Sequence, residues 1–230
     1  MAAEIRTVAE TGSTNDDLIA LARAGAPEGT WLRAGRQTGG KGRQGRTWQS
    51  PAGNLHASAL VRLQPDDPPA PTLALVAAVA LHEAASAYAS GITVKWPNDL
   101  VVGAAKLAGI LLEREGAAVV AGFGVNLAAH PDLADRPATS LAALAGASPE
   151  PAEFLNRLAE AFGQWLGRWR TEGLAEVRQR WLDAAHPLGT ALSTGEGEGR
   201  FDGLDGSGAL RLRRPDGTVR LIHAGDIFLI

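Results

Sequence analysis

The sequence has no cysteine among its 230 residues. This absence excludes disulfide bonds, a thiolate nucleophile and a zinc site built from cysteine. It also agrees with a cytoplasmic location, because disulfides are rare in that compartment. We therefore expect a cytoplasmic protein whose chemistry does not depend on thiols.

The sequence also lacks any apolar run long enough to cross a bilayer. The longest run, residues 70–81, ends at His82 and Glu83, whereas a membrane-spanning helix needs about 20 apolar residues. The N-terminus carries Glu4 and has no long apolar core, which excludes a secretory signal. We expect no membrane partner.

Neither sign of charge dominates, because 22 basic residues stand against 25 acidic ones. A dedicated nucleic-acid binder usually has a basic surface, so we expect no nucleic-acid partner. Hydrophobic residues make up 45 % of the chain. Its length suits one sizeable core with a small appended domain.

Hydrophobic periodicity predicts a chain that mixes helices and strands. Ser13 or Thr14 can cap a first helix, and Gly25 stands where that helix should end. The predicted helices are 13–25, 72–90, 149–173 and 174–185, and the predicted strands are 30–37, 54–63, 92–96, 106–113 and 117–126. After residue 187, short alternating runs and turn signals predict a small all-β domain of about five strands.

The stretch RQTGGKGRQGRTW (36–48) contains the pattern G-x-G-x-x-G at Gly40, Gly42 and Gly45. In a dinucleotide-binding turn this pattern opens a helix and is followed by an acid about 20 residues later. Here Pro51 and Gly53 prevent such a helix. A Walker A loop is excluded too, because no serine or threonine follows the Gly-Lys pair. The stretch is therefore a glycine-rich loop between two strands.

The same loop carries Arg36, Lys41, Arg43 and Arg46 and no acidic residue. Glycines let backbone N–H groups turn toward an anion, and arginine grips phosphate with two hydrogen bonds. Like charges about 4 Å apart repel by about 1 kcal/mol in water, so we expect the loop to be poorly ordered until an anion binds. A solvated basic hairpin tip is the alternative interpretation.

A second unusual stretch is VKWPNDLVVGAAKLAGILLE (94–113). Its Asn98 and Asp99 follow a proline, which predicts that their side chains lie at a turn. Lys106 opens an otherwise apolar strand, either as a positive charge held over a developing negative one or as an edge lysine that reaches solvent. Gly109 predicts a close approach to the same strand.

With these motifs assembled, the chain resembles the biotin–protein ligases, also called biotin–[acetyl-CoA-carboxylase] ligases. The motifs occur in the family's order, with STN at 13–15, GRQTGGKGRQGRTW at 35–48, VKWPNDL at 94–100, KLAGILLE at 106–113 and GFGVNL at 122–127. Asn126 in the last motif either orients a ligand or serves a turn.

The resemblance implies an α+β fold in two domains. Residues 1–185 are expected to form the catalytic domain, a mixed sheet with flanking helices similar to class II aminoacyl-tRNA synthetase cores. Residues 186–230 are expected to form a small SH3-like β-barrel. Because the first motif starts at Ser13, we expect the monofunctional form without the DNA-binding domain of the bifunctional ligase–repressors.

The resemblance also implies an activity, the ATP-dependent biotinylation of one lysine on the biotin carboxyl carrier domain of acetyl-CoA carboxylase. The biotin carboxylate attacks the α-phosphate of ATP to form biotinyl-5′-AMP, and the carrier lysine then attacks this anhydride and releases AMP. Biotin and ATP are substrates, Mg²⁺ is the expected cofactor and the carrier domain is the protein partner. A homodimer through sheet edges agrees with many bacterial relatives.

The family's site residues carry over to matching positions. Lys106, Arg43 and Asp99 are the expected catalytic residues, with Lys106 between the biotin carboxylate and the α-phosphate and Asp99 as a base for the carrier lysine. The expected contacts to biotin and its adenylate come from Ser13, Thr14, Asn15, Gln37, Gly40, Lys41, Gly42, Arg43, Arg46, Trp48, Asn98, Lys106, Gly109 and Asn126. No residue is assigned as a metal ligand.

Within this set, the resemblance gives each group a place. The biotin ureido ring is expected among Ser13, Thr14, Asn15 and Gln37, the loop from Gly40 to Arg43 closes over the adenylate, and Trp48 covers the adenine. Asn98 and Asp99 are expected at the triphosphate–magnesium end or at the incoming lysine. Lys41 stands where the family often has arginine. A lysine keeps the positive charge but cannot make the two parallel hydrogen bonds of a guanidinium.

Two other functions remain open from the sequence. A lipoate–protein ligase of the same superfamily also binds an acyl chain that ends in a carboxylate. A nucleotide- or nucleic-acid-binding module built around the basic loop would show a strong dependence on salt.

Overall fold

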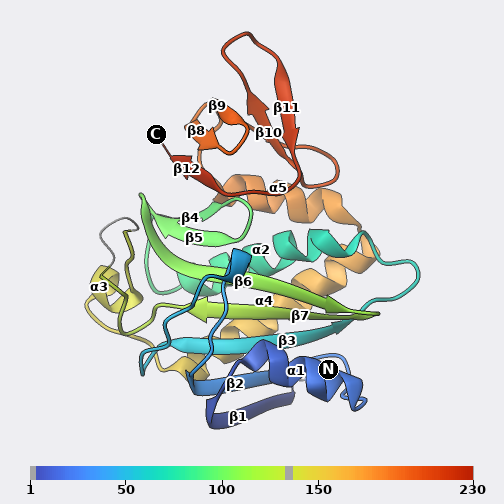
Figure 1. The fold of residues 1–230 in the computed structure, drawn as a ribbon, viewed down its shortest axis with the longest axis vertical. Helices are drawn as coiled ribbons and strands as arrows, with labels where there is room; N and C mark the ends of the chain where they lie inside the picture. The colour runs from blue at the N-terminus through green and yellow to red at the C-terminus, as the bar shows by residue number, and fades with distance from the viewer. Residues whose placement is uncertain (1–3, 133–136, 230) are drawn as a thin grey trace.

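The computed structural model describes residues 4–132 and 137–229. It contains one layered α/β unit with a smaller sheet beside it (Figure 1). The strands are β1 Glu4–Thr11, β2 Thr30–Gln37, β3 Leu55–Arg62, β4 Ile92–Lys95, β5 Asp99–Val102, β6 Ala105–Glu115, β7 Ala118–Val125, β8 Ala191–Thr194, β9 Gly197–Leu204, β10 Leu210–Arg213, β11 Val219–Ile222 and β12 Ile227–Leu229. The α-helices are α1 Thr14–Arg23, α2 Leu73–Ser86, α3 Leu141–Ala145, α4 Pro151–Thr171 and α5 Leu174–Ala184, with short 3₁₀ turns at Arg43–Gly45 and Ala70–Thr72.

The larger sheet has seven strands in the order β1-β2-β3-β7-β6-β5-β4. Only β1 and β2 run parallel, and each of the other neighbouring pairs is antiparallel. The sheet is therefore mixed, as expected. The central strand β7 pairs with β6 along its whole length, from Ala108 opposite Val125 to Glu115 opposite Ala118.

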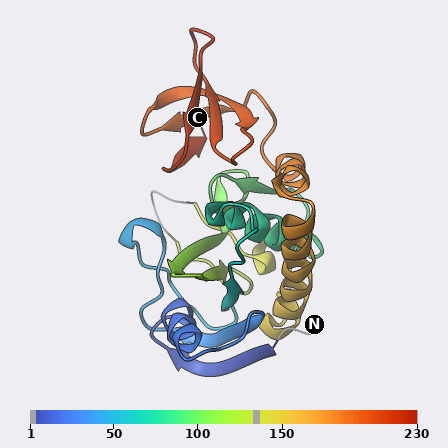
Figure 2. The same ribbon diagram turned by 90° about the vertical axis from the view of Figure 1, so that its right-hand side faces the viewer.

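Helices cover both faces of this sheet (Figure 2). On one face α1 packs its Leu18 against Leu32 and Leu60. On the other face α2 and α4 build the main core, where the rings of Trp31 and Phe123 stack at 5.6 Å. The apolar stripe predicted for α4 is confirmed as core, because its phenylalanines, leucines and tryptophans are buried there.

The predicted helices and strands are present, with ends that shift by a few residues. Two strands were missed. β1 is an edge strand whose residues are mostly exposed or half-buried, so it lacks the apolar alternation of a half-buried strand. β5 has four residues and starts at Asp99, which the sequence placed in a turn. The turn ends one residue earlier, at Asn98.

The smaller sheet has five antiparallel strands in the order β11-β10-β9-β8-β12. The predicted all-β C-terminal segment is thus confirmed. This sheet lies beside β4 and β5 in Figure 1, and Trp96 Nε1 donates to the Gly208 carbonyl oxygen across the junction at 3.3 Å. Within the two described stretches of chain, no helix is both long and apolar enough to span a membrane.

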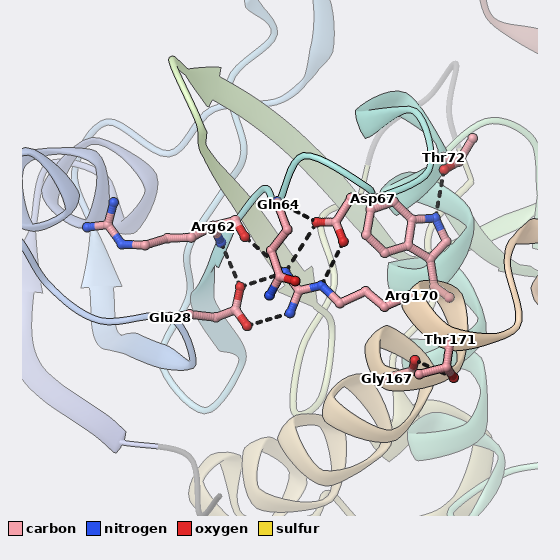
Figure 3. Close-up of polar contacts among 9 residues, drawn as sticks. Glu28, Arg62, Gln64, Asp67, Thr72, Gly167, Arg170 and Thr171 are labelled. Atoms are coloured by element: carbon pink, nitrogen blue, oxygen red, sulfur yellow. Dashed lines mark hydrogen bonds and ion pairs between the residues drawn. The ribbon is translucent and has the colours of Figure 1, made fainter.

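A polar network ties the end of α4 to the rest of the unit (Figure 3). The guanidinium of Arg170 donates to both oxygens of Glu28, at 2.6 and 2.8 Å, and to Asp67 Oδ1 at 3.0 Å. It also donates to the Arg62 carbonyl oxygen at 2.9 Å. The Arg62 side chain donates in turn to the carbonyl oxygen of Ala26, so the network joins α4 to the loop that follows α1.

Arg170→Met is expected to lower the free energy of unfolding by about 3 kcal/mol, because it leaves the half-buried carboxylate of Glu28 and the largely buried carboxylate of Asp67 without their charged partner. The hydrogen bond from Arg170 holds the pKa of Glu28 below its ordinary value. That stabilisation is present above the unfolded pKa of about 4.3 and is lost as pH falls through the folded pKa. Urea titrations should therefore show a difference in the free energy of unfolding between wild type and Arg170→Met that becomes smaller as the pH falls.

Arg168→Met on the same helix is the matched control, since Arg168 pairs with Glu176 at an exposed site. Its expected cost is below about 1 kcal/mol. Equal costs for the two variants would contradict the structural role given to Arg170.

Candidate active site

A cavity of about 750 Å³ lies over one face of β6 and β7, between the glycine-rich loop and the small C-terminal sheet. The predicted site residues that line it are Ser13, Thr14, Asn15, Gln37, Lys41, Gly42, Arg43, Arg46, Trp48, Asn98, Asp99, Lys106, Gly109 and Asn126. Gly40 is the exception among the predicted residues. Its backbone closes the loop instead, because Trp48 N–H donates to the Gly40 carbonyl oxygen at 2.9 Å.

The N-terminus of α1 supplies the polar end of this cavity. Ser13 is the helix cap, as predicted, and Thr14 and Asn15 are buried behind it. Gln37 Oε1 accepts from Thr14 N–H at 2.8 Å. Ser58, a buried residue of β3, donates to Asn15 Oδ1 at 2.6 Å. The side chains of Ser13, Thr14, Asn15 and Gln37 that line this end are thus neutral donors and acceptors.

The floor of the cavity is bare backbone, because glycines occupy matching positions on β6 and β7. Gly109 lies directly opposite Gly124 in the ladder. A Cβ atom at Gly124 would overlap the indole of Trp48, and one at Gly122 would overlap Asn15 Oδ1. The predicted close approach at Gly109 is also present, since a Cβ there would lie 3.1 Å from Lys106 Nζ. These glycines let side chains from distant segments lie flat on the sheet.

The cations of the loop each meet an acidic residue from elsewhere in the chain. Lys41 pairs with Asp16 of α1 at 2.6 Å, and this hydrogen bond raises the pKa of Lys41. Arg43 and Arg46 both pair with Asp226, which directly precedes β12. The expected repulsion among the loop cations is therefore compensated. Sequence reasoning missed this because the acids lie far from the loop along the chain.

The remaining loop cation, Arg36, pairs with Glu10 of β1 at 3.4 Å and is not among the lining residues. Arg43 makes two hydrogen bonds to residues outside the loop. It donates to Asn98 Oδ1 at 3.2 Å and to the Gly225 carbonyl oxygen at 3.1 Å. One side chain of the loop thus connects the Asn98 turn with the C-terminal sheet.

Lys106 stands at the mouth of β6 as predicted, and it is not a simple edge lysine. Its ammonium lies 2.6 Å from Asp99 Oδ1 and 5.6 Å from the centre of the Trp48 ring. The backbone around it is held by Lys106 N–H, which donates to the Pro137 carbonyl oxygen at 2.8 Å. Lys106 and Asp99 form the only ion pair between two predicted catalytic residues that the described residues contain.

Two of the three asparagines of the predicted site, Asn98 and Asn126, hold backbone carbonyl groups in place. Asn98 Nδ2 donates to the Ile110 carbonyl oxygen at 2.5 Å. Asn126 Nδ2 donates to the Thr139 carbonyl oxygen at 3.0 Å, and Asn126 Oδ1 accepts from Asn54. Asn126 therefore organises the segment beside Lys106, and it lines the cavity as well.

Several residues of this site were not predicted. Lys95 lines the cavity, and burial lowers its pKa; its position directly before the WPND motif was the available signal. Asp226 and Phe228 also line the cavity, but the C-terminal segment gives no signal that it contacts this site. Ser58 and Glu113 lie behind the lining residues and act on Asn15.

Two family models match this chain. Residues 11–127 match the model described as "Biotin/lipoate A/B protein ligase family", and residues 190–230 match "Biotin protein ligase C terminal domain".

Curated relatives match along nearly the whole chain. A biotin–[acetyl-CoA-carboxylase] ligase of Paracoccus denitrificans is 40 % identical over 238 residues, which cover 96 % of this chain and 98 % of that relative. A protein of the same description from Mycobacterium tuberculosis is 35 % identical, with 97 % and 88 % covered.

Solved structures show the same fold. The biotin protein ligase from Aquifex aeolicus in complex with biotin and ATP superposes with a TM-score of 0.87 at 26 % identity, and 99 % of this chain and 98 % of that chain are covered. The Leishmania major biotin protein ligase in complex with biotinyl-5-AMP has a TM-score of 0.70 at 26 % identity, with 96 % and 99 % covered.

Proposed function

The chain belongs to the biotin/lipoate A/B protein ligase family, and from that premise we propose how its cavity performs biotin transfer. The activity is that of a biotin–[acetyl-CoA-carboxylase] ligase, with biotin and ATP as substrates and biotinyl-5′-AMP as the intermediate. The protein partner is a biotin carboxyl carrier domain, whose lysine accepts the biotinyl group.

One observation favours biotin over lipoate, namely the hydrogen-bonding pattern at the polar end of the cavity. Gln37 Oε1 already accepts from Thr14, and Gln37 Nε2 donates one hydrogen to Ser50 Oγ at 3.5 Å, so the other amide hydrogen is left for a ligand carbonyl. Asn15 uses its two amide hydrogens on protein acceptors and its oxygen accepts from Ser58, so one lone pair of that oxygen is left for a ligand N–H. A cyclic urea presents a carbonyl beside an N–H, whereas the dithiolane ring of lipoate presents neither.

The first step brings a carboxylate to a polyanion, so it needs fixed positive charge at the reacting atoms. The carboxylate oxygen forms a bond to the α-phosphorus, and the bond to the departing pyrophosphate breaks. Lys106 is assigned to the carboxylate and α-phosphate, which fits its place over the glycine floor. Arg43, Arg46 and Lys95 are assigned to the phosphates, because all three line the same cavity.

In the second step the carrier lysine must lose a proton before its nitrogen attacks the acyl carbon. Asp99 is assigned as the base, since it is a half-buried carboxylate at the cavity wall. Asp99 pairs with Lys106 in the free protein, and the role of base requires Lys106 to turn to the adenylate when that ligand binds, because an ion pair with lysine makes a carboxylate a weaker base. The attack forms the amide bond and breaks the bond from the acyl carbon to the AMP oxygen.

Magnesium is assigned to the substrate as MgATP. Among residues 4–132 and 137–229 no cluster of three acidic, histidine or cysteine side chains could hold a metal on its own. Mg²⁺ in nucleotide sites is commonly held by phosphates with one or two carboxylates. Asp99 and Asp226 line the cavity and are the carboxylates available to it.

Three further assignments rest on the resemblance. The catalytic domain ends at residue 185, and the C-terminal domain begins at residue 186. A cytoplasmic location suits an enzyme that consumes ATP. A homodimer would use an edge of the large sheet, where β1 has a hydrogen-bonded neighbour on one side.

The test of the activity is ATP-dependent transfer of labelled biotin to a purified carrier domain. Parallel reactions contain lipoate with a lipoyl carrier domain, and duplex DNA in a binding assay over a range of salt concentrations. We expect pyrophosphate release and labelled carrier with biotin alone. Lipoylation without biotinylation, or tight salt-dependent DNA binding without pyrophosphate release, would overturn the assignment.

Arg43→Gly is expected to release biotinyl-5′-AMP before transfer, because the loop loses its bonds to Asn98 and Gly225. The free adenylate then acylates lysines at random. Labelled biotin should appear on a bystander protein such as serum albumin at least about tenfold faster than with wild type, a change of about 1.4 kcal/mol in retention.

The matched control is Arg36→Gly, which removes an arginine of the same basic stretch that lies outside the cavity. This control should label only the carrier domain. If Arg43→Gly also labels only the carrier domain, the loop does not retain the adenylate.

A further inference from the structure

Glu113 lies behind the floor of the cavity, near the end of β6, and does not line it. Its Oε2 accepts a hydrogen bond from Asn15 Nδ2 at 2.7 Å. Asn15 itself is buried, with 4 % of its surface exposed, and it does line the cavity. Glu113 therefore touches the polar end of the site through one residue.

The hydrogen bonds of Asn15 can be counted completely. Its two amide hydrogens go to the Glu113 carboxylate and to the Leu111 carbonyl oxygen, at 2.7 and 3.3 Å. Both partners can only accept, so the amide nitrogen must face them. Ser58 Oγ lies 2.6 Å from Asn15 Oδ1 and 2.7 Å from Thr14 Oγ1. Because Oδ1 can only accept whereas the threonine hydroxyl can also donate, the single hydrogen of Ser58 is assigned to Asn15 Oδ1. One lone pair on Oδ1 is then the hydrogen-bonding capacity that Asn15 has left.

We propose that Glu113 is a positioning residue for biotin, which holds Asn15 so that only its amide oxygen faces the ligand. An acceptor at this place selects the ureido N–H of biotin. This inference rests on the proposed function, because it deepens the assignment of the same end of the cavity.

A carboxylate is well suited to this task for two reasons. It accepts without donating, and its charge strengthens the hydrogen bond from the amide. Glu115, two residues along the same strand, faces the same helix but pairs with Arg23 at 2.5 Å. Two acids on one strand therefore contact α1 at different places, one at the ligand site and one at the exposed end.

The experiment compares Glu113→Leu and Glu113→Gln with Glu115→Leu as the matched control, all in the full chain. Glu113→Leu is expected to raise the KM for biotin about tenfold, the loss of roughly one charge-assisted hydrogen bond. The KM for ATP and kcat should change by less than about twofold, since no reacting atom is touched. Glu113→Gln keeps an accepting oxygen and should restore most of the affinity, and Glu115→Leu should match wild type.

A biotin analogue methylated at the ureido nitrogen separates positioning from general support of the fold. With wild type, methylation should raise KM strongly because Asn15 Oδ1 loses its partner. With Glu113→Leu the same methylation should have a clearly smaller effect, as coupled contacts do in a double-mutant cycle.

An unchanged biotin KM in Glu113→Leu, or equal effects of methylation in both proteins, would overturn the proposal. So would a joint loss of kcat and ATP affinity that the glutamine variant fails to restore. Failure of the proposed function looks different, because wild type itself would then transfer no biotin.

Discussion

Lys106→Ala should lower the rate of biotinyl-5′-AMP formation by about a thousandfold, while the protein keeps its fold. The reason is electrostatic. A preorganised cation at developing negative charge contributes about 10²–10³ to the rate in comparable sites, and phosphoryl transfer depends almost wholly on such charges. Lys106 is the cation placed on the glycine floor itself, next to Gly109.

The structural cost of this substitution is expected to be small. Asp99, the partner of Lys106, is 19 % exposed, and removing a lysine side chain that is itself 37 % exposed opens the remaining carboxylate to water. Its backbone bonds to Pro137 and Thr139 do not involve the side chain. Lys106→Ala should therefore lower the rate of adenylate formation and leave the midpoint of urea unfolding unchanged.

Single-turnover formation of the adenylate, measured by quenched flow with labelled ATP, is the appropriate assay. Arg114→Ala is the control, because Arg114 lies on the same strand, is exposed, and donates to the Gly116 carbonyl oxygen. The control should react at the wild-type rate. A wild-type rate in Lys106→Ala would remove Lys106 from the chemistry.

Gly122→Ala is expected to raise the Kd for biotin about 100-fold, the equivalent of roughly two lost hydrogen bonds. The new methyl group would overlap Asn15 Oδ1 and lie 2.9 Å from Asn15 Cγ. Ser58 and Glu113 hold that side chain from two sides, so it has no free direction in which to move. Asn15 must leave the polar end of the cavity.

Isothermal titration with biotin, together with a urea titration, tests this expectation. Gly167→Ala is the matched control, because a Cβ atom there meets open space on α4. It should bind biotin normally and gain about 0.5–1 kcal/mol in stability from helix propensity. Normal biotin affinity in Gly122→Ala would show that the overlap is relieved without loss of the site.

Much of the candidate site could be predicted because its residues occur in compact motifs. The sequence placed Lys106 at the start of an apolar strand and Gly109 three residues later on the same strand, so both positions lie within one short segment. The helix cap at Ser13 could be predicted because a serine hydroxyl accepts a hydrogen bond from a backbone N–H of the first helical turn. These features depend on neighbours within a few residues.

The partners of the loop cations could not be predicted in the same way. Asp16 lies 25 residues before Lys41, and Asp226 lies 180 residues after Arg46. Nothing in the local pattern distinguishes these acids from others in the chain. The repulsion expected among these cations is therefore compensated by acids that local sequence does not reveal, and poor order without an anion stays a prediction.

The missed strands have a related cause. β1 is stabilised by its parallel pairing with β2, from Glu4 opposite Thr30 to Thr11 opposite Gln37, and hydrogen bonds between strands leave little trace in the residue types of an exposed edge. β5 is too short for a period of two to be visible.

The sequence by itself therefore determined the family, the mixed α/β fold with its small β segment, and the residue types that line one cavity. Only the tertiary structure decided which atoms of those residues are free for a ligand. Asn15 shows why. It lies on helix α1, and the orientation of its amide follows from Glu113 on β6 and Ser58 on β3. Hydrogen bonds have direction, and their partners come together only when distant segments pack.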